Sequence, residues 1–115
     1  MAPIQTQMGV ENRMHLIQIL LPLYDNEGTA FPQQEYAAVR DELTERFGGI
    51  TTYLRSPAEG SWRESPWQTI HDEIVIYEVM TDNLDREWWR AYREGLAKRY
   101  RQELLIVRVS EMQLL

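Results

Sequence analysis

The chain has 115 residues, of which 43% are hydrophobic and 26% charged, and its formal net charge is −6. This length is typical of one globular domain, and the acidic balance argues against nucleic-acid binding, which needs a surplus of Lys and Arg on one surface. The absence of cysteine excludes disulfides and thiolate metal sites, and the presence of only two histidines argues against a histidine metal centre.

Residues 1–13 are predicted to form a flexible tail, without the apolar segment of a signal peptide. The apolar run at residues 14–23 predicts a first strand. It is too short to cross a bilayer, so we expect no membrane partner and a cytoplasmic location. A helix is predicted over residues 32–47, because proline suits the first helical turn and Gly48 can end the helix in the left-handed conformation.

The rest of the chain predicts a strand, a long connection, a strand, a helix and a strand, over residues 50–55, 56–69, 70–80, 84–102 and 104–109. Asp85 and its neighbours offer side chains that can cap the second helix. Residues 111–115 are expected to form a C-terminal tail. The predicted single domain therefore covers residues 14–110.

The two predicted helices carry nearly the same pattern, 53 residues apart. Their apolar positions are Tyr36, Val39, Leu43 and Phe47 in the first and Trp89, Tyr92, Leu96 and Tyr100 in the second. A duplicated strand–helix–strand unit in a short chain predicts an α+β fold, the ferredoxin-like βαββαβ two-layer sandwich. Right-handed crossovers give an antiparallel sheet of strand order 4-1-3-2 with both helices on one face. The remaining charges of the helices are interpreted as a solvated surface.

Alternation along the two central strands separates two faces of the sheet. The face expected to meet the helices comprises Ile17, Ile19, Leu21, Leu23, Val75, Tyr77 and Val79. The opposite face comprises Leu16, Gln18, Leu20, Ile74, Ile76, Glu78 and Met80. Because an apolar surface of this size is unfavourable in water, we predict that a second copy packs on it, giving a homodimeric α/β barrel.

Glu78 is the first candidate for acid–base chemistry, since apolar surroundings disfavour the ionised form of a carboxylate. The competing interpretation is a structural ion pair with Arg55 or Arg108. Gln18 is its expected neighbour and either orients a ligand or only satisfies Glu78. Tyr53 and Arg55 are the further candidates for ligand binding on the second strand.

His71 is the second acid–base candidate, because it lies beside two carboxylates in the sequence. Adjacent strand residues point to opposite faces, so only Glu73 can share its side. Two ligands do not make a metal site, and no metal or cofactor is predicted.

The connection at residues 56–69 is much longer than an ordinary hairpin loop and carries Trp62 and Trp67. Tryptophan is costly to leave in water, so the first interpretation is an arm that packs on a partner subunit. The alternative is a lid over a pocket, in which Trp62 and Arg63 contact an anionic organic ligand.

This pattern resembles the dimeric α/β-barrel group of ferredoxin-like proteins, which includes small monooxygenases, isomerases of ring-cleavage products and stress-response barrels. The stretches RFGGIT (46–51) and PAEGSW (57–62) also resemble those of a set of small uncharacterised bacterial proteins, with a likeness over residues 16–109. No catalytic motif of a named barrel enzyme is present. No activity carries over from the resemblance. From the residues themselves we predict a homodimer that binds a small organic ligand, with acid–base chemistry as one option. The alternative is a non-catalytic assembly or interaction module.

Overall fold

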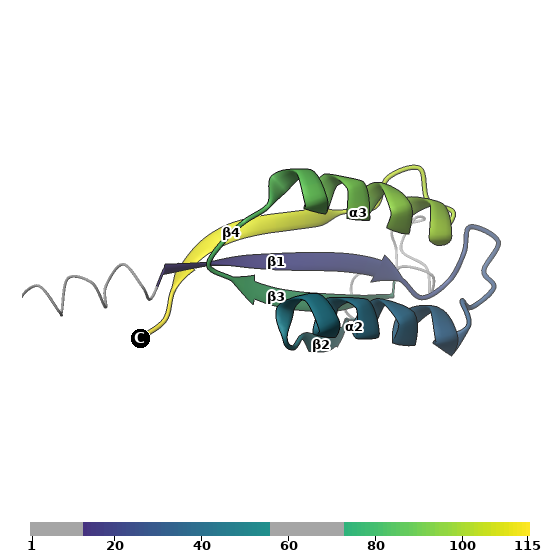
Figure 1. Ribbon diagram of the computed structural model, residues 1–115. Helices are drawn as coiled ribbons and strands as arrows, with labels where there is room; N and C mark the ends of the chain where they lie inside the picture. The colour runs from purple at the N-terminus through teal and green to yellow at the C-terminus, as the bar shows by residue number, and fades with distance from the viewer. Residues whose placement is uncertain (1–12, 56–72) are drawn as a thin grey trace, which may run out of the picture.

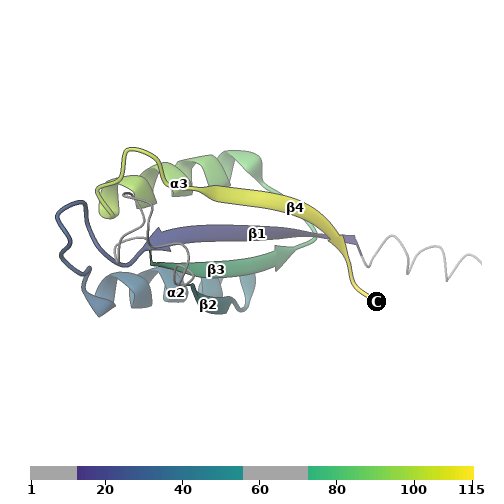
Figure 2. The ribbon, with the colours of Figure 1, turned by 180° about the vertical axis from the view of Figure 1, so that it is seen from behind.

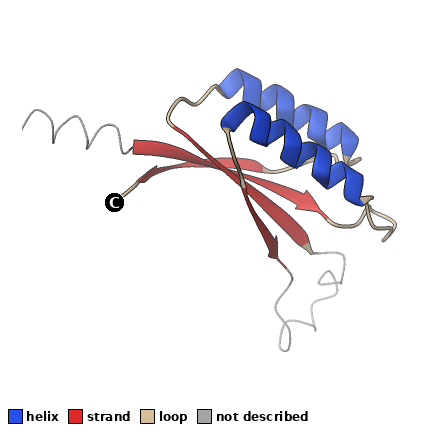
Figure 3. Ribbon diagram, turned by 60° about the horizontal axis from the view of Figure 1, so that its bottom comes forward, coloured by secondary structure: helices blue, strands red, loops and turns tan. Residues whose placement is uncertain are grey.

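The computed structural model describes residues 13–55 and 73–115, and for residues 54 and 55 it describes the backbone alone. Its elements are β1 (Arg13–Pro22), α2 (Gln33–Phe47), β2 (Thr51–Arg55), β3 (Ile74–Thr81), α3 (Arg86–Arg99) and β4 (Val107–Gln113). The strands form one antiparallel sheet of order β2-β3-β1-β4, which is the predicted order read from the other edge. Both helices lie on one face of this sheet (Figures 1 and 3). The predicted ferredoxin-like sandwich is confirmed.

Most elements differ from the predicted ranges at one end or both, and two of these differences have a clear cause. β4 continues to Gln113, whereas the predicted strand ended at residue 109, because Glu111 and Gln113 find backbone partners opposite the first residues of β1. Figure 2 shows these two strands side by side up to the C-terminal end of β4. α3 begins later than predicted, since the carboxylate of Asp85 caps its start by accepting the backbone N–H of Trp88 at 3.1 Å, and it ends at Arg99.

The repeated helical pattern forms the core between the two layers. Leu43 of α2 and Leu96 of α3 occupy equivalent positions and have no exposed surface. Around them are buried the helix side chains Tyr36, Val39, Trp89 and Tyr100, and the sheet side chains Ile17, Ile19, Leu21, Val75, Tyr77 and Val79. The predicted division of the central strands into two faces is therefore confirmed for the side that meets the helices.

Two tyrosine hydroxyls connect the layers within this core. Tyr36 donates to the carbonyl of Pro22 at 2.5 Å, and Tyr77 donates to the carbonyl of Tyr36 at 3.0 Å. Burial raises the pKa of Tyr36 to about 12, so this hydroxyl stays protonated and remains a donor at neutral pH. These bonds hold α2 over the end of β1 and the middle of β3.

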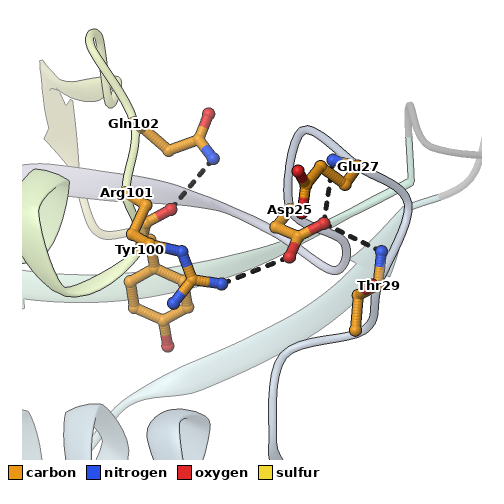
Figure 4. Close-up of polar contacts among 6 residues, drawn as sticks. All are labelled: Asp25, Glu27, Thr29, Tyr100, Arg101 and Gln102. Atoms are coloured by element: carbon orange, nitrogen blue, oxygen red, sulfur yellow. Dashed lines mark hydrogen bonds and ion pairs between the residues drawn. The ribbon is translucent and has the colours of Figure 1, made fainter.

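The loop after β1 is fastened to the end of α3 by Asp25 (Figure 4). Its Oδ1 accepts the backbone N–H groups of Glu27 at 2.9 Å and Thr29 at 2.8 Å, and its Oδ2 lies 3.2 Å from the guanidinium of Arg101. The guanidinium of Arg101 in turn lies 5.2 Å from the ring centroid of Phe31. One carboxylate thus orders its own turn and joins two segments that are far apart in the sequence.

We expect Asp25→Ala to lower the Tm at neutral pH. The turn then loses the acceptor of two backbone N–H groups, and the ion pair to Arg101 is lost as well. The backbone hydrogen bond from Thr29, followed by the backbone hydrogen bond from Glu27 and the guanidinium of Arg101, holds the pKa of Asp25 below its ordinary value of 3.8. A lowered folded-state pKa contributes stability above the ordinary value, and this contribution is lost as the pH falls through the folded-state pKa. The Tm difference between the two proteins should therefore shrink in acid below pH 3.8. Thermal unfolding followed by circular dichroism measures this Tm difference, with Asp82→Ala as the control. A Tm difference that does not change with pH would show that the ionised Asp25 carboxylate does not stabilise the turn.

Candidate functional site

Three polar side chains form a continuous row across the sheet face that the helices leave open. Glu78 of β3 lies directly opposite Gln18 of β1, and Gln18 lies directly opposite Arg108 of β4. Gln18 Nε2 donates to Glu78 Oε2 at 2.6 Å, and Arg108 Nε donates to Gln18 Oε1 at 2.8 Å. We call these three residues the polar row.

The register of the strands explains why the polar row forms. Residues directly opposite each other in an antiparallel ladder project from the same face, so Gln18 has one polar neighbour on each side. Its amide is both a donor and an acceptor, and it uses one function toward each charged neighbour. The predicted contact between Gln18 and Glu78 is present. Instead of an ion pair between Glu78 and Arg108, the structure places the amide between the two charges.

The surroundings of the polar row on the two central strands are apolar. On one side Leu16 faces Met80, and on the other Leu20 faces Ile76 in the paired register. The outer part of this face is only partly covered, since Met80 is 47% exposed and Ile106 is 46% exposed. A carboxylate and a guanidinium thus lie in the middle of a mostly apolar face, to which the edge strands add Thr51 and Ser110.

A hollow of about 350 Å³ lies beside Glu78, at the corner where α2 turns into β2. Its lining includes Gly48, Gly49, Thr51, Glu78 and Met80. Gly48 has a φ of 84°, the left-handed conformation that ends α2, and Thr51 faces Glu78 across the β2–β3 pair. We call this concavity the Glu78 hollow.

One oxygen of the Glu78 carboxylate is available within the Glu78 hollow or over the open face. Oε2 accepts from Gln18, whereas no donor binds Oε1 among the residues that the structure describes. Such a carboxylate can accept a hydrogen bond or a proton from a ligand while Gln18 holds its position. Residues 13–55 and 73–115 contain no group of three or more metal-ligating side chains.

The structure describes some of the predicted site residues, and the others lie outside the described ranges. Gln18 and Glu78 are in contact. Tyr53 pairs with Ile76, two residues from Glu78 on β3, and its side chain is 48% exposed. The backbone of Arg55 pairs with Ile74. The other candidates, His71, Trp62, Arg63 and Trp67, lie outside the described residues.

Two members of the site were missed or misjudged from the sequence. Thr51 was not singled out, and Arg108 was considered only as an ion-pair partner of Glu78. The signal was the strand order, because an edge strand beside β1 must place one of its residues opposite Gln18. The exact register was needed to select Arg108.

A scan against protein-family models found no match, and a search of curated proteins found no similar sequence. Among solved structures, the fold is similar to that of a phage SAM lyase in complex with S-methyl-5'-thioadenosine, with a TM-score of 0.55. The match covers 88% of this chain and 90% of the other, at 12% sequence identity, and at that identity it shows a shared fold alone. Within the described part of this chain, no helix is long and apolar enough to cross a membrane.

Proposed function

We propose that the protein binds a small organic ligand at Glu78, on the open face of the sheet, and that a second copy covers this face to form an α/β barrel. The observation that carries the proposal is the polar row, set in a mostly apolar surface and leaving Glu78 Oε1 without a donor in the described structure. Glu78 is half-buried, so this oxygen stays accessible and can accept a hydrogen bond from a ligand donor.

The Glu78 hollow supports this assignment by its size. Its volume of about 350 Å³ falls within the roughly 300–1,000 Å³ typical of small-molecule sites. Its lining combines backbone at Gly48 and Gly49, the hydroxyl of Thr51, the carboxylate of Glu78 and the apolar Met80. A suitable ligand carries an N–H, O–H or cationic group for Glu78 and an apolar part for Met80.

The structurally similar phage SAM lyase suggests the first compounds to test. Its complex contains S-methyl-5'-thioadenosine, a molecule that joins an apolar thioether to a purine with N–H donors. We infer that this chain binds a ligand of related chemistry. In an enzymatic form of the proposal, Glu78 accepts a proton from the ligand, Gln18 positions the carboxylate, and His71 serves as a second proton-transfer group.

The polar row also suits contact between two copies. A two-fold axis that runs along the strands near Gln18 would bring Arg108 of one copy opposite the partner's Glu78, so that opposite charges meet. The half-exposed apolar side chains Met80 and Ile106 would be covered in the same contact. The alternative function, a non-catalytic assembly module, uses this interface without a ligand.

We expect Glu78→Gln to weaken ligand binding by about tenfold or more, because a hydrogen bond to a charged group contributes roughly 1.5–3 kcal/mol. The measurement is the rise in Tm on addition of S-methyl-5'-thioadenosine or SAM, compared among the wild type, Glu78→Gln and Glu103→Gln. Glu103 is exposed and outside the site, so its variant controls for the lost charge.

Equal ligand-induced Tm shifts in Glu78→Gln and the wild type would show that Glu78 does not contribute to ligand binding. A protein that is dimeric but responds to neither compound would favour the assembly alternative.

A further inference from the structure

A second concave site lies on the opposite side of the sheet, between α3 and β4, which run side by side (Figure 1). It has a volume of about 130 Å³. Its lining comprises the apolar residues Ile17, Leu84, Trp89, Val107 and Val109 and the α3 arginines Arg86, Arg90 and Arg93. We call it the arginine cleft. It shares no ligand-facing group with the Glu78 hollow.

The three arginines lie on one face of α3, since spacings of four and three residues place side chains next to each other on a helix. Arg86 and Arg90 are exposed and Arg93 is half-buried. Arg108 also lines the cleft, but its Nε donates to Gln18 on the other face of the sheet, so it is not counted here.

No carboxylate forms an ion pair with these three arginines within the described structure. The lining of the arginine cleft contains no Asp or Glu, and none of its three α3 arginines has an ion pair or hydrogen bond to a described residue. Two other helix arginines have partners: Arg99 lies 2.9 Å from Glu42, and Arg46 lies 4.2 Å from the ring centroid of Trp88.

The repulsion among these arginines is only partly offset on the helix, where Glu87 and Glu94 lie three and four residues from Arg90. Like charges four residues apart on a helix, such as Arg86 and Arg90, destabilise it. The chain as a whole carries a net charge of −6, and the three unpaired arginines of the cleft form a local positive charge that contrasts with it. An anion bound between the guanidinium groups would remove the repulsion and use their planar donors.

We infer that the arginine cleft binds a compact organic anion, in which a phosphate or carboxylate contacts the three arginines and a small apolar group contacts Trp89 and Val107. The guanidinium groups supply charge-assisted hydrogen bonds, and the apolar part of the lining selects against a fully hydrated inorganic ion. The small volume limits the apolar part to about the size of one aromatic ring. This inference is independent of ligand binding at Glu78.

The test is an NMR titration of the full chain, labelled with ¹⁵N, with phenyl phosphate, benzoate, inorganic phosphate and phenol. We expect saturable shifts of the backbone amides of α3 and β4 with phenyl phosphate, benzoate or both, and these two arms distinguish the two anionic groups. Inorganic phosphate should bind at least about tenfold more weakly than phenyl phosphate, and phenol should give no saturable shift.

Variants locate the site. Arg90→Gln and Arg93→Gln should each raise the Kd about tenfold or more, because each removes charge-assisted hydrogen bonds. Lys98→Gln removes one positive charge from the same helix without touching the cleft, and should change the Kd less than twofold. The inference is overturned if Lys98→Gln weakens binding as much as the arginine variants, if phenol binds as well as the anions, or if no anion shifts these amides at millimolar concentration.

Discussion

Replacing Leu43 or Leu96 by alanine is expected to lower the free energy of unfolding by about 2–5 kcal/mol in each case. Both side chains are fully buried, at equivalent positions of the two repeated helices, and both pack into one core between helices and sheet. Truncation removes buried methyl groups and leaves a cavity that the surrounding sheet and helix side chains cannot fill, which is why the effect exceeds that of simple transfer to water.

Urea unfolding followed by circular dichroism measures this effect. Leu104→Ala is the matched control, since Leu104 is 71% exposed and its loss should change the free energy of unfolding by less than about 0.5 kcal/mol. The double variant should be largely unfolded without urea, because a typical domain has only about 5–15 kcal/mol of stability. Losses below about 1 kcal/mol for both single variants would show that these leucines do not fill the core as described.

Introducing a carboxylate on the open face, by Met80→Glu or Ile106→Glu, is expected to convert a dimer into a folded monomer. Each side chain is nearly half-exposed in the single chain, so the monomer can keep the new carboxylate in water. A dimer packed through this face would have to bury that charge without a partner, which costs several kcal/mol and should raise the dimer Kd by about 100-fold or more.

Sedimentation velocity at micromolar concentration separates the two states. Val109→Glu is the control, because Val109 is 40% exposed and lies in β4 but lines the arginine cleft on the helix side of the sheet. This variant should stay dimeric, and all three variants should keep the circular dichroism spectrum of the wild type. A wild-type protein that sediments as a monomer would refute sheet-to-sheet association.

The elements with strong periodic patterns could be predicted from the sequence. The 3-4-4 spacing of apolar residues around Leu43 and Leu96 is a local property, and so is the alternation along β1 and β3. The end of β4 could not be predicted in the same way. Its last residues are polar and mostly exposed, and they are strand because the N-terminal part of β1 supplies their backbone partners.

The candidate site was only partly visible in the sequence. The contact between Gln18 and Glu78 was expected because alternation places both on the open face. The position of Arg108 on the far side of Gln18 depends on register, which is set by pairing between strands some 90 residues apart. The arginine cleft was missed because its charges were interpreted as a solvated helix surface. The helical spacing of its three arginines can be read from the sequence, whereas the position of β4 beside α3 cannot.

The sequence by itself therefore determined the order of elements, the two faces of the central strands and the pairing of two similar helices with one sheet, because these follow from the periods of the backbone and from the burial of apolar side chains. Only the tertiary structure decided which polar groups meet. Hydrogen bonds and charge clusters depend on distances of a few ångströms between segments remote in the chain, and a local pattern carries no information about those distances.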